Sequence, residues 1–481
     1  MPIDTTAPGS PGWWLNRLAQ QLVARRPLIR NLRAYMDGRA PLPEGAEGCR
    51  EAYRRFQKFA RTNFAELVVE AVQERMIPTG FRTGADGDEN GDDLARQVWH
   101  ANNLDIFAPD VHTDMLAARA GYTIVGPPED GVPVITVEDP ELVITAHDAR
   151  RPQQVIAGLK MFRDDVLERE FAYLYLPGQV FVASRRADDP TLPPGDDFES
   201  HRQPEISLHG WDWDEERSGP LPAGLEDVVP VARFRNRRGL GEFETHLDVI
   251  DRINYVVLQR LVIAAMQAYR QRAIEEGDTP LPEADESGNT IDYATLFKPG
   301  PGALWQLPAG AKLWESQTVD LTPLLSAAKD DIRDLAAVTR TPLSMLLPDG
   351  QNQTAEGANF AREGLIFKTH DRIKRATYGW NRTLSIAFRF MGETERANIL
   401  DMETLWKPPE RLTLSERADA ASKAQDDFPW RSRMAEIWGM SPEAISRMES
   451  ERVADAMLAA SLAPPPGAAP QEQGAADGDT A

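Results

Sequence analysis

The acidic stretch DGDENGDDLARQ at residues 86–97 is the part of the sequence most like a metal site. Four of its residues match positions one, three, five and six of a calcium-binding loop: Asp86, Asp88, Asn90 and Gly91. Position twelve is Gln97, which cannot supply the bidentate carboxylate that such a site needs, and no clear helix precedes the loop. The pattern therefore favours an acidic surface loop without a metal ion.

Catalytic and cofactor-binding motifs are not found elsewhere in the sequence. The seven histidines lack the i, i+4 pairing with an acid that marks a zinc site: His100, His112, His147, His201, His209, His246 and His370. The chain has no G-x-S-x-G elbow, no G-x-x-x-x-G-K-S/T phosphate loop and no G-x-G-x-x-G after a predicted strand. Carboxylates are so common that any choice of an acid/base pair would be arbitrary. We therefore expect no enzymatic activity, no metal and no cofactor.

The charge balance limits the partners that the chain can bind. Its 481 residues allow two or three domains, and 75 acidic against 53 basic residues give a formal net charge of −22. This excess of acid argues against tight wrapping of nucleic acid, although DNA can still be a neighbour. The charge is segmental, because residues 120–149 hold six carboxylates and no Lys or Arg, whereas residues 13–36 hold five arginines and no acid.

Cysteine content and hydropathy indicate where the chain is made. A single Cys49 cannot form an intrachain disulfide, and no secretory leader opens the sequence. The longest apolar runs, such as LVIAAM at 261–266, are far shorter than the ~20 residues of a membrane helix. We expect synthesis in a reducing cytoplasm and no contact with a membrane.

The N-terminal part is predicted to be helical. Residues 1–12 predict a flexible arm, and the apolar pattern is helical from Trp13 to about Glu74. The stretch WWLNRLAQQLVARRPLIRNL could be a basic amphipathic helix that lies on a membrane or on phosphates. We favour the alternative, in which it docks on its own protein or a neighbour and its arginines meet acidic groups.

Short β-branched runs separated by Gly, Pro and Asp turns follow between residues 122 and 235. They are YTIVG, VPVITVED, ELVITAHD, QVIAGLKMFR, EFAYLYL, QVFVASRR and VVPVARFR. This pattern predicts an antiparallel sheet. Together with the N-terminal helices it indicates a helix-rich α+β fold over residues 13–242.

Residues 243–276 contain no Gly or Pro and predict a helix ~50 Å long. Positions alternating by three and four form an apolar seam in which only Asn254 is polar: Leu247, Ile250, Asn254, Val257, Leu261 and Ala264. A second apolar stripe covers Val256, Leu258, Val262 and Ile263. A helix apolar on most of its circumference needs cover on several sides. We infer that neighbouring subunits provide it; a central helix of one large monomeric domain is the alternative.

Four further segments complete the chain. A Pro/Gly/Asp-rich insertion at 277–320 contains a predicted hairpin in GALWQLPAGAKLWESQ. A helix at 321–340 has one apolar face and ends at Pro342, and residues 341–353 form a loop. A third long helix begins at Thr354, inside segment 354–411, and its apolar residues recur at helical spacing, which predicts a buried seam: Ile366, Ile373, Trp380, Leu384 and Phe388. A helical segment at 412–460 precedes a tail at 461–481 that we expect to be disordered.

Several of these segments, in this order, resemble the portal proteins of tailed bacteriophages, particularly long-tailed phages of actinobacteria. The similar stretches include AYMDGRAPLP, NFAELVVEAVQERMIPTGFR, RINYVVLQRLVIAAMQAYRQRAI, DDIRDLAAVTRTPLSMLLPDGQNQTAEGA and GLIFKTHDRIKR. The resemblance covers roughly residues 15–410. It implies a ring, usually of twelve subunits, at one capsid vertex, with double-stranded DNA entering and leaving through the central channel.

The resemblance also implies a role for each segment. Residues 13–242 would be an α/β wing, 243–276 and 321–340 the two stem helices, and 277–320 a small α/β clip. Residues 341–353 would be the channel loop, 354–411 the long wing helix and its return, and 412–460 a helical crown. The implied partners are the terminase large subunit, a head–tail adaptor, and the major capsid and scaffolding proteins. The implied location is the virion.

Two sets of residues are candidates to face the DNA. In the loop these are Ser344, Asp349, Gln351, Asn352 and Gln353, because amides can hydrogen-bond phosphates without a fixed charge. In the clip, acidic residues could line a lumen that repels DNA, or could equally be a solvated outer face: Glu275, Glu276, Asp278, Glu283, Asp285 and Glu286. The basic cluster Lys368, Arg372, Lys374 and Arg375 could meet DNA, but we favour neutralisation of nearby acids.

Two other classes of function stay open at this point. One is a ring-forming or scaffold protein without a DNA role. The other is a cytoplasmic enzyme with an unrecognised site, which the missing motifs disfavour. The portal hypothesis is the one that the order of segments supports best.

Overall fold

The computed structural model describes most of the chain. The described residues are 3–42, 51–85, 91–164, 166–186, 210–268, 272–275, 284, 288, 290–291, 312–315, 319–347, 355–410 and 413–462. The helices are α1 (Pro11–Met36), α2 (Glu51–Phe59), α3 (Phe64–Gln73), α4 (Asp93–Ala101), α5 (Leu104–Ala117), α6 (Leu247–Ala268), α8 (Thr322–Thr339), α9 (Leu343–Leu346), α10 (Ala355–Met391), α11 (Leu414–Lys423), α12 (Trp430–Ser432) and α13 (Pro442–Leu462). Single turns lie at Arg237–Gly239, Glu244–His246 and Arg433–Ile437.

The strands form four antiparallel sheets. They are β1 (Pro78–Arg82), β2 (Ala120–Glu129), β3 (Val132–Glu138), β4 (Val143–His147), β5 (Val155–Asp164), β6 (Arg169–Leu176), β7 (Gln179–Arg186), β8 (Asp212–Pro220), β9 (Val231–Arg235), β10 (Arg272–Glu275), β11 (Lys312–Glu315) and β12 (Glu403–Trp406). Their orders are β4-β5-β6-β7-β8, β3-β2-β9, β1-β12 and β10-β11. The antiparallel pairing and the helix-rich α+β class are confirmed, but the strands predicted to form one sheet are divided between two, β4-β5-β6-β7-β8 and β3-β2-β9.

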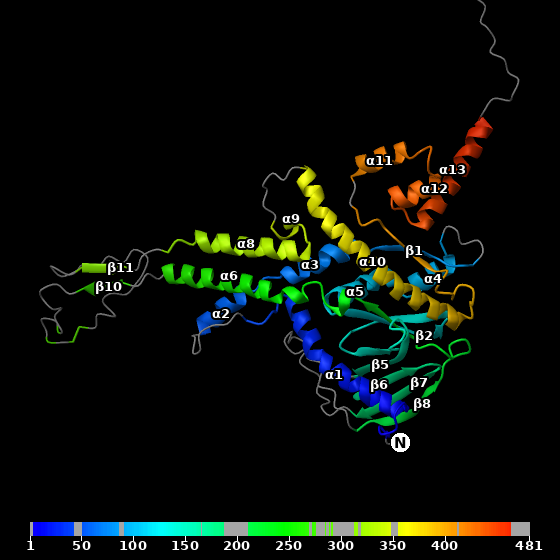
Figure 1. Ribbon diagram of the computed structural model, residues 1–481, viewed down its shortest axis with the longest axis horizontal. Coiled ribbons are helices and arrows are strands. Elements are labelled where there is room, and N and C mark those ends of the chain that lie inside the picture. Colours follow the sequence, from blue (N-terminus) through cyan, green and yellow to red (C-terminus); the bar gives the residue numbers. More distant parts are fainter. Residues whose placement is uncertain are drawn as a thin grey trace, which may run out of the picture.

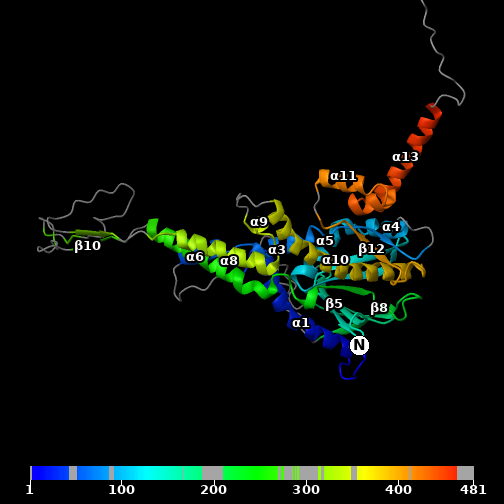
Figure 2. The ribbon, with the colours of Figure 1, turned by 45° about the horizontal axis from the view of Figure 1, so that its top comes forward.

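A body and a projection make up the shape of the molecule (Figure 1). Helices α6 and α8 lie side by side and extend out of the body, with β10 and β11 beyond their far ends, and Figure 2 shows the same arrangement after rotation. The last helices, α11 to α13, lie on the opposite side of the body from this projection. We call α6 and α8 the projecting pair.

Helix α1 packs across the five-stranded sheet through its apolar face. Leu15, Leu18 and Leu22 share a buried cluster with Leu159 and Leu174 of the sheet. The arginines of α1 meet acidic groups of the same chain: Arg30 binds Glu141 at 2.8 Å, and Arg33 binds Asp114 at 3.0 Å and Asp139 at 2.8 Å. The preferred prediction for this basic helix, docking on its own protein, is therefore confirmed.

Helix α10 runs through the main core of the body. Four residues of its predicted seam are buried: Ile373, Trp380, Leu384 and Phe388. The fifth, Ile366, is only partly buried. The Trp380 ring lies 4.8 Å from the ring centroid of Phe234 on β9. A Cβ at the adjacent Gly379 would stand 2.3 Å from that Phe234 ring, so a residue without a side chain is required there. This helix and the three-stranded sheet form one packed unit.

Predicted boundaries differ from the structure at three places, one of which is the loop predicted at 341–353, where Leu343–Leu346 form helix α9. The long helix predicted over 243–276 spans Leu247–Ala268, and Arg272–Glu275 form a strand instead. This strand pairs with Lys312–Glu315, so a long-range partner overrides the helical propensity of its local sequence. Of the hairpin predicted within GALWQLPAGAKLWESQ, only Lys312–Glu315 is described, so the hairpin itself stays a prediction. The predicted N-terminal arm is shorter than twelve residues, because α1 begins at Pro11 with Ser10 as its cap.

Strand β8 and the pair formed by β1 and β12 were not predicted from the sequence. Strand β8 reads DWDEERSGP, which has too many acids and too few β-branched residues to predict a strand. Strand β1 lies where the sequence predicted only a break after the N-terminal helices, and it pairs with β12 near the other end of the chain. Helices are present in the predicted C-terminal segment 412–460, and α13 continues to Leu462. The rest of the predicted tail lies outside the described residues.

Candidate functional site

The projecting pair is the most prominent candidate site, because it leaves the body that would otherwise cover it. Arg252 of α6 binds Asp331 at 2.8 Å and Asp334 at 3.2 Å on α8. Toward the far end, the Gln267 amide donates to the Val319 carbonyl oxygen at 2.6 Å. These polar contacts, together with the apolar face of α8, hold the two helices side by side in antiparallel orientation.

The predicted seam of α6 is buried only near the body. Ile250 and Asn254 are buried, and Leu247 and Val257 pack against the core from partly buried positions. Farther out, Leu261 is only partly buried and Ala264 is exposed. The second stripe follows the same trend, since Leu258 is buried while Val262 and Ile263 are partly exposed. The outer half of the pair therefore presents apolar residues that are only partly buried.

Asn254, the polar residue of the seam, contacts another segment of its own chain. Its side-chain oxygen accepts hydrogen bonds from the backbone N–H of Thr62, at 2.9 Å, and from the Thr62 hydroxyl, at 2.7 Å. Thr62 lies between α2 and α3. Asn254 thus fixes this connection against the base of α6, a contact that the sequence did not indicate.

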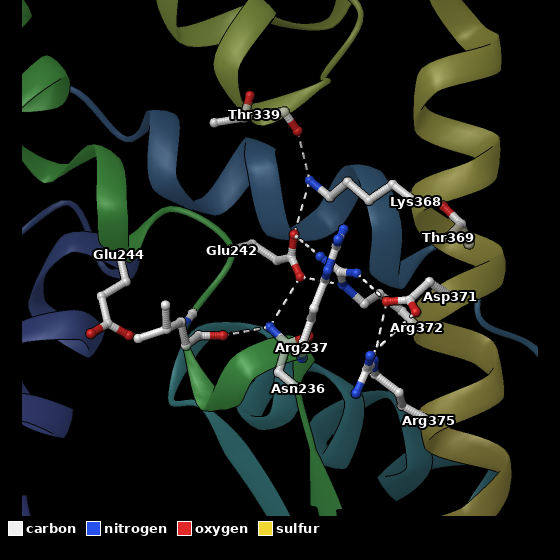
Figure 3. Close-up of polar contacts among 12 residues, drawn as sticks. Asn236, Arg237, Glu242, Glu244, Thr339, Lys368, Thr369, Asp371, Arg372 and Arg375 are labelled. Atoms are coloured by element: carbon white, nitrogen blue, oxygen red, sulfur yellow. Dashed lines mark hydrogen bonds and ion pairs between the residues drawn. The ribbon is translucent and has the colours of Figure 1, made fainter.

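A buried ion cluster centred on Glu242 joins the base of the pair to α10 (Figure 3). Glu242 binds Arg372 at 2.6 Å and Lys368 at 3.1 Å, and the Asn236 amide donates to it at 3.0 Å. Lys368 also donates to the Thr339 carbonyl oxygen, at the end of α8, at 2.9 Å. One carboxylate therefore links the segment that leads into α6, the last turn of α8 and the middle of α10.

The electrostatics of this cluster keep its groups charged. Burial by itself raises the pKa of the Glu242 carboxyl, but Lys368 and Arg372 offset this effect and hold the pKa below its ordinary range. Burial lowers the pKa of the Lys368 amine, and the charge of Glu242 opposes that change. A buried carboxylate with two cations and an amide donor is well compensated.

The predicted basic cluster on α10 acts mainly inside the protein. Lys368 and Arg372 bind Glu242, and Arg375 binds Asp371 at 3.1 Å. Lys374 is exposed. The favoured interpretation, neutralisation of nearby acids, is confirmed for three of the four residues. Sequence reasoning missed Glu242 itself, although it is the first acid after a run that contains Arg233, Arg235, Arg237 and Arg238.

Most of the predicted DNA-facing residues lie outside the described residues. In the loop, Ser344 is exposed on α9, whereas Asp349, Gln351, Asn352 and Gln353 are not described. In the insertion, Glu275 ends strand β10. Glu276, Asp278, Glu283, Asp285 and Glu286 are not described.

Neither a metal site nor a membrane span is found where the structure describes the chain. No group of three or more His, Cys, Asp or Glu side chains within the described ranges is placed to hold a metal ion. No helix in those ranges is long and apolar enough to cross a bilayer. Asp92, in the stretch that resembles a calcium loop in sequence, caps helix α4: its side chain accepts a hydrogen bond from the Ala95 N–H at 2.9 Å.

Comparison with known proteins gives consistent matches over most of the chain. Residues 15–456 match the family model of the phage portal protein, SPP1 Gp6-like. The portal protein of Mycobacterium phage D29 is 27% identical over 385 residues, which cover 76% of this chain and 72% of that protein. The portal protein of Mycobacterium phage L5 is 27% identical over 417 residues, covering 83% and 79%.

Among solved structures, the chain is similar to a component of the virion of a native gene transfer agent particle, with a TM-score of 0.41, 12% identity and coverage of 86% and 99%. A component of the neck of the native particle matches with a TM-score of 0.41, 11% identity and coverage of 85% and 98%. Because the family model spans nearly all of the described sequence, from α1 into α13, this chain belongs to the SPP1 Gp6-like family of phage portal proteins.

Proposed function

We propose that this portal protein assembles into a ring, of about twelve copies by analogy with its family, at one vertex of the capsid. The observation that carries the proposal is the projecting pair, whose outer apolar residues, such as Leu261 and Ile263, stay partly exposed in the single chain. A ring places the same pair of the next subunit beside them. Neighbouring copies would then complete the burial that one chain leaves unfinished.

The segments take the following roles in this proposal. The body formed by residues 13–242 and 354–411 is the wing, and α6 and α8 are the stem. Strand β11 lies within the clip, 277–320, and its partner β10 lies just before the clip, at the end of the first stem segment. Residues 341–353 are the channel loop, and 412–460 are the crown. The contacts of Glu242 support this division, because they join wing and stem at a single buried point.

The central channel of this ring is the passage for double-stranded DNA during packaging and ejection. Twelve copies would carry about 260 net negative charges, and an acidic wall keeps DNA from adhering to it. The clip carboxylates and the polar side chains of the channel loop are the proposed contacts with DNA. This arrangement lets DNA slide without being gripped.

The protein would act in the virion after synthesis in the host cytoplasm. Its proposed partners are the terminase large subunit during packaging, a head–tail adaptor afterwards, and the major capsid and scaffolding proteins during assembly. As a portal protein it is a structural component and not an enzyme. A separate motor is consistent with the absence of a phosphate-loop motif in the sequence.

Electron microscopy of the purified protein, alone and with capsid and scaffolding proteins, tests the proposal. Rings with a central channel are the expected result. A monomer under all of these conditions would rule the ring out. Rings that never enter a capsid would favour a scaffold protein without a DNA role.

A second experiment tests the channel loop alone. Replacing residues 349–353 with alanines should leave the rings intact and reduce the amount of DNA packaged into capsids, because the polar side chains next to DNA are lost. Alanine replacement of the exposed residues Val166 and Leu167, at the tip of the β5–β6 hairpin, is the matched control. Normal packaging by the loop variant would remove its proposed role.

A further inference from the structure

A cationic pocket lies at the junction of the projecting pair and the body. Its volume is about 310 Å³, and since a water molecule occupies ~30 Å³ of liquid, the pocket has room for a small anion with some of its water. Among the described residues that line it, one carboxylate, Glu242, faces five cations: Arg237, Arg238, Arg340, Lys368 and Arg372. The lining therefore has an excess of positive charge, although the chain as a whole has a net charge of −22.

The inner cations of the pocket are already compensated. Lys368 and Arg372 are buried, and both bind Glu242. Arg372 also binds Asp371, which lies outside the lining. These two cations form a floor whose charge is matched by carboxylates of the same chain.

The outer cations have no such compensation. Arg237, Arg238 and Arg340 are exposed, and within the described part of the chain none of them forms an ion pair with a carboxylate. We call these three residues the arginine rim. A guanidinium group presents paired N–H donors that fit the oxygens of a phosphate group. The rim therefore has the chemistry of a phosphate site.

The charges of the pocket act on one another. Burial lowers the pKa of the Lys368 amine, Glu242 opposes this change, and the charges of Arg372 and Arg340 lower the pKa further. Burial also lowers the pKa of His246, another lining residue, and the charge of Lys368 adds to this effect. The pocket thus has a positive potential in spite of Glu242, and a bound anion would relieve the repulsion among its cations.

Backbone conformation places two rim residues at unusual angles. Arg238 has φ of 58° and Arg340 has φ of 54°, which is the left-handed region that favours glycine. Arg340 directly follows α8 and packs against α10, because a Cβ added at Gly364, one turn before Lys368, would stand 3.8 Å from the Arg340 Cβ. Residues other than glycine in this backbone region cluster at ligand sites. Two of them line this one pocket.

We infer that the pocket binds a phosphate group, with the arginine rim donating hydrogen bonds to its oxygens. All of the lining residues belong to one chain, so the site itself does not depend on ring formation. Two sources supply such a group: a phosphodiester of DNA, or free inorganic phosphate.

The place of the rim in the chain favours DNA as the source, and this part of the inference rests on the proposed function. Arg340 directly precedes residues 341–353, the proposed channel loop. A rim residue and the loop that is proposed to touch DNA are therefore neighbours. The pocket would add one attractive contact per subunit to a channel wall that is otherwise acidic.

Thermal denaturation of the full-length protein in sodium phosphate and in sodium chloride, at equal ionic strength, tests the site. At about ten times the Kd, phosphate should raise the Tm by roughly 2 °C more than chloride does. Arg238→Gln and Arg340→Gln should each remove at least about half of this difference. Glutamine removes the guanidinium group but keeps the backbone restriction of a residue other than glycine. Arg150→Gln, at an exposed arginine between β4 and β5, is the matched control and should keep the full difference.

A second measurement identifies the source of the phosphate group. Fluorescence anisotropy with a labelled DNA duplex, at increasing NaCl concentration, gives the affinity and its dependence on salt. Each rim variant should weaken binding by about threefold to tenfold and should reduce the slope of log K against log salt concentration by about one. Arg150→Gln should leave both quantities close to those of the unmodified protein.

The two measurements together decide the inference. Loss of the phosphate effect and of DNA affinity in the rim variants supports a site that DNA occupies, and loss of the phosphate effect alone supports a site for free phosphate. No phosphate effect in the unmodified protein, or one that the rim variants keep in full, would overturn the inference. Loss of rings in the variants without any phosphate effect would also overturn it and would assign the rim to a contact between subunits. A protein that binds phosphate but never forms rings would contradict the proposed function and leave the phosphate site in place.

Discussion

The body and the projecting pair differ in how far a single chain completes their packing. In the body, the α10 seam residues Trp380, Leu384 and Phe388 are fully buried by elements of the same chain. In the pair, Leu261 is partly exposed and Ala264 is exposed, although they belong to an equally regular seam. Similar sequence periodicity therefore has two outcomes. A seam predicts burial, but only the surroundings decide whether the cover comes from the chain itself or from a neighbour.

The ion pairs of the body and of the projecting pair also differ in how far they are buried. Glu242 in the body is buried with its partners Lys368 and Arg372. Arg252, which links the two projecting helices, is 49% exposed. Water screens the exposed pair, so it contributes on the order of 0–1 kcal/mol. The buried cluster is more sensitive, because removing one partner leaves a charge without compensation.

The largest expected effect in this comparison comes from Trp380→Ala. The Trp380 side chain packs between Trp99 and Phe234, with ring centroids 4.8 Å apart in both cases, and donates to His112 at 3.0 Å. Removing it from a fully buried position should lower the free energy of unfolding by about 4–5 kcal/mol. Urea titration followed by circular dichroism measures the change. Phe367→Ala, at a residue 64% exposed on the same helix, is the control and should cost less than about 1 kcal/mol.

Glu242→Gln should lower the free energy of unfolding by a smaller amount, about 3 kcal/mol. Lys368 and Arg372 would keep their buried charges without a carboxylate beside them. The pKa of Glu242 lies below its ordinary value of 4.5, so its contribution to stability is present above pH 4.5 and is lost as the pH falls through the lowered pKa. Urea titrations between pH 3 and 7 should therefore show a smaller acid-induced loss in the variant. Asp331→Asn, in the exposed pair with Arg252, is the control. Equal costs for the two variants would contradict the distinction between the regions.

Local pattern was enough to predict most elements of the body. The α10 seam and seven of the strand runs could be read from spacing and β-branched residues, because both are buried by regular neighbours. The strand at Arg272–Glu275 could not, since its helical local sequence is overridden by pairing with a segment about 40 residues away. The pairing of β1 with β12 was missed for the same reason.

The candidate site was less predictable than the fold. Glu242 and Arg372 are 130 residues apart in the sequence, so no motif brings them together. Asn254 could be singled out as a polar residue in an apolar seam, but its partner Thr62 is 192 residues away. Contacts of this kind depend on the tertiary arrangement, which spacing does not encode.

His112 provides an effect on stability that is absent at neutral pH and develops only in acid. It is completely buried, and burial lowers its pKa from 6.5 to about 3. Below pH 6.5 the imidazole is therefore protonated in the unfolded chain but stays neutral in the folded chain. As the pH falls from 6.5 to 3, the free energy of unfolding decreases by roughly 1.4 kcal/mol per pH unit. Replacing His112 with Gln, which keeps a polar group near Trp380 but does not titrate, should remove this slope. Thermal denaturation at a series of pH values measures it, and an unchanged slope would show that His112 is not its source.

The smallest effect on the single chain, and the sharpest test of the comparison, is expected for Leu261→Ser. Leu261 is partly exposed on α6, so the substitution removes little burial and should cost the monomer less than about 1 kcal/mol. In a ring it would weaken a seam repeated at every subunit boundary, and the ring fraction seen by mass photometry should fall strongly. Leu258→Ser changes the same residue type about one turn away, at a position that is 1% exposed. It should instead cause a large loss of monomer stability. If both variants unfold alike and Leu261→Ser still forms rings, the outer half of the pair is covered by its own chain, and the difference between body and projection disappears.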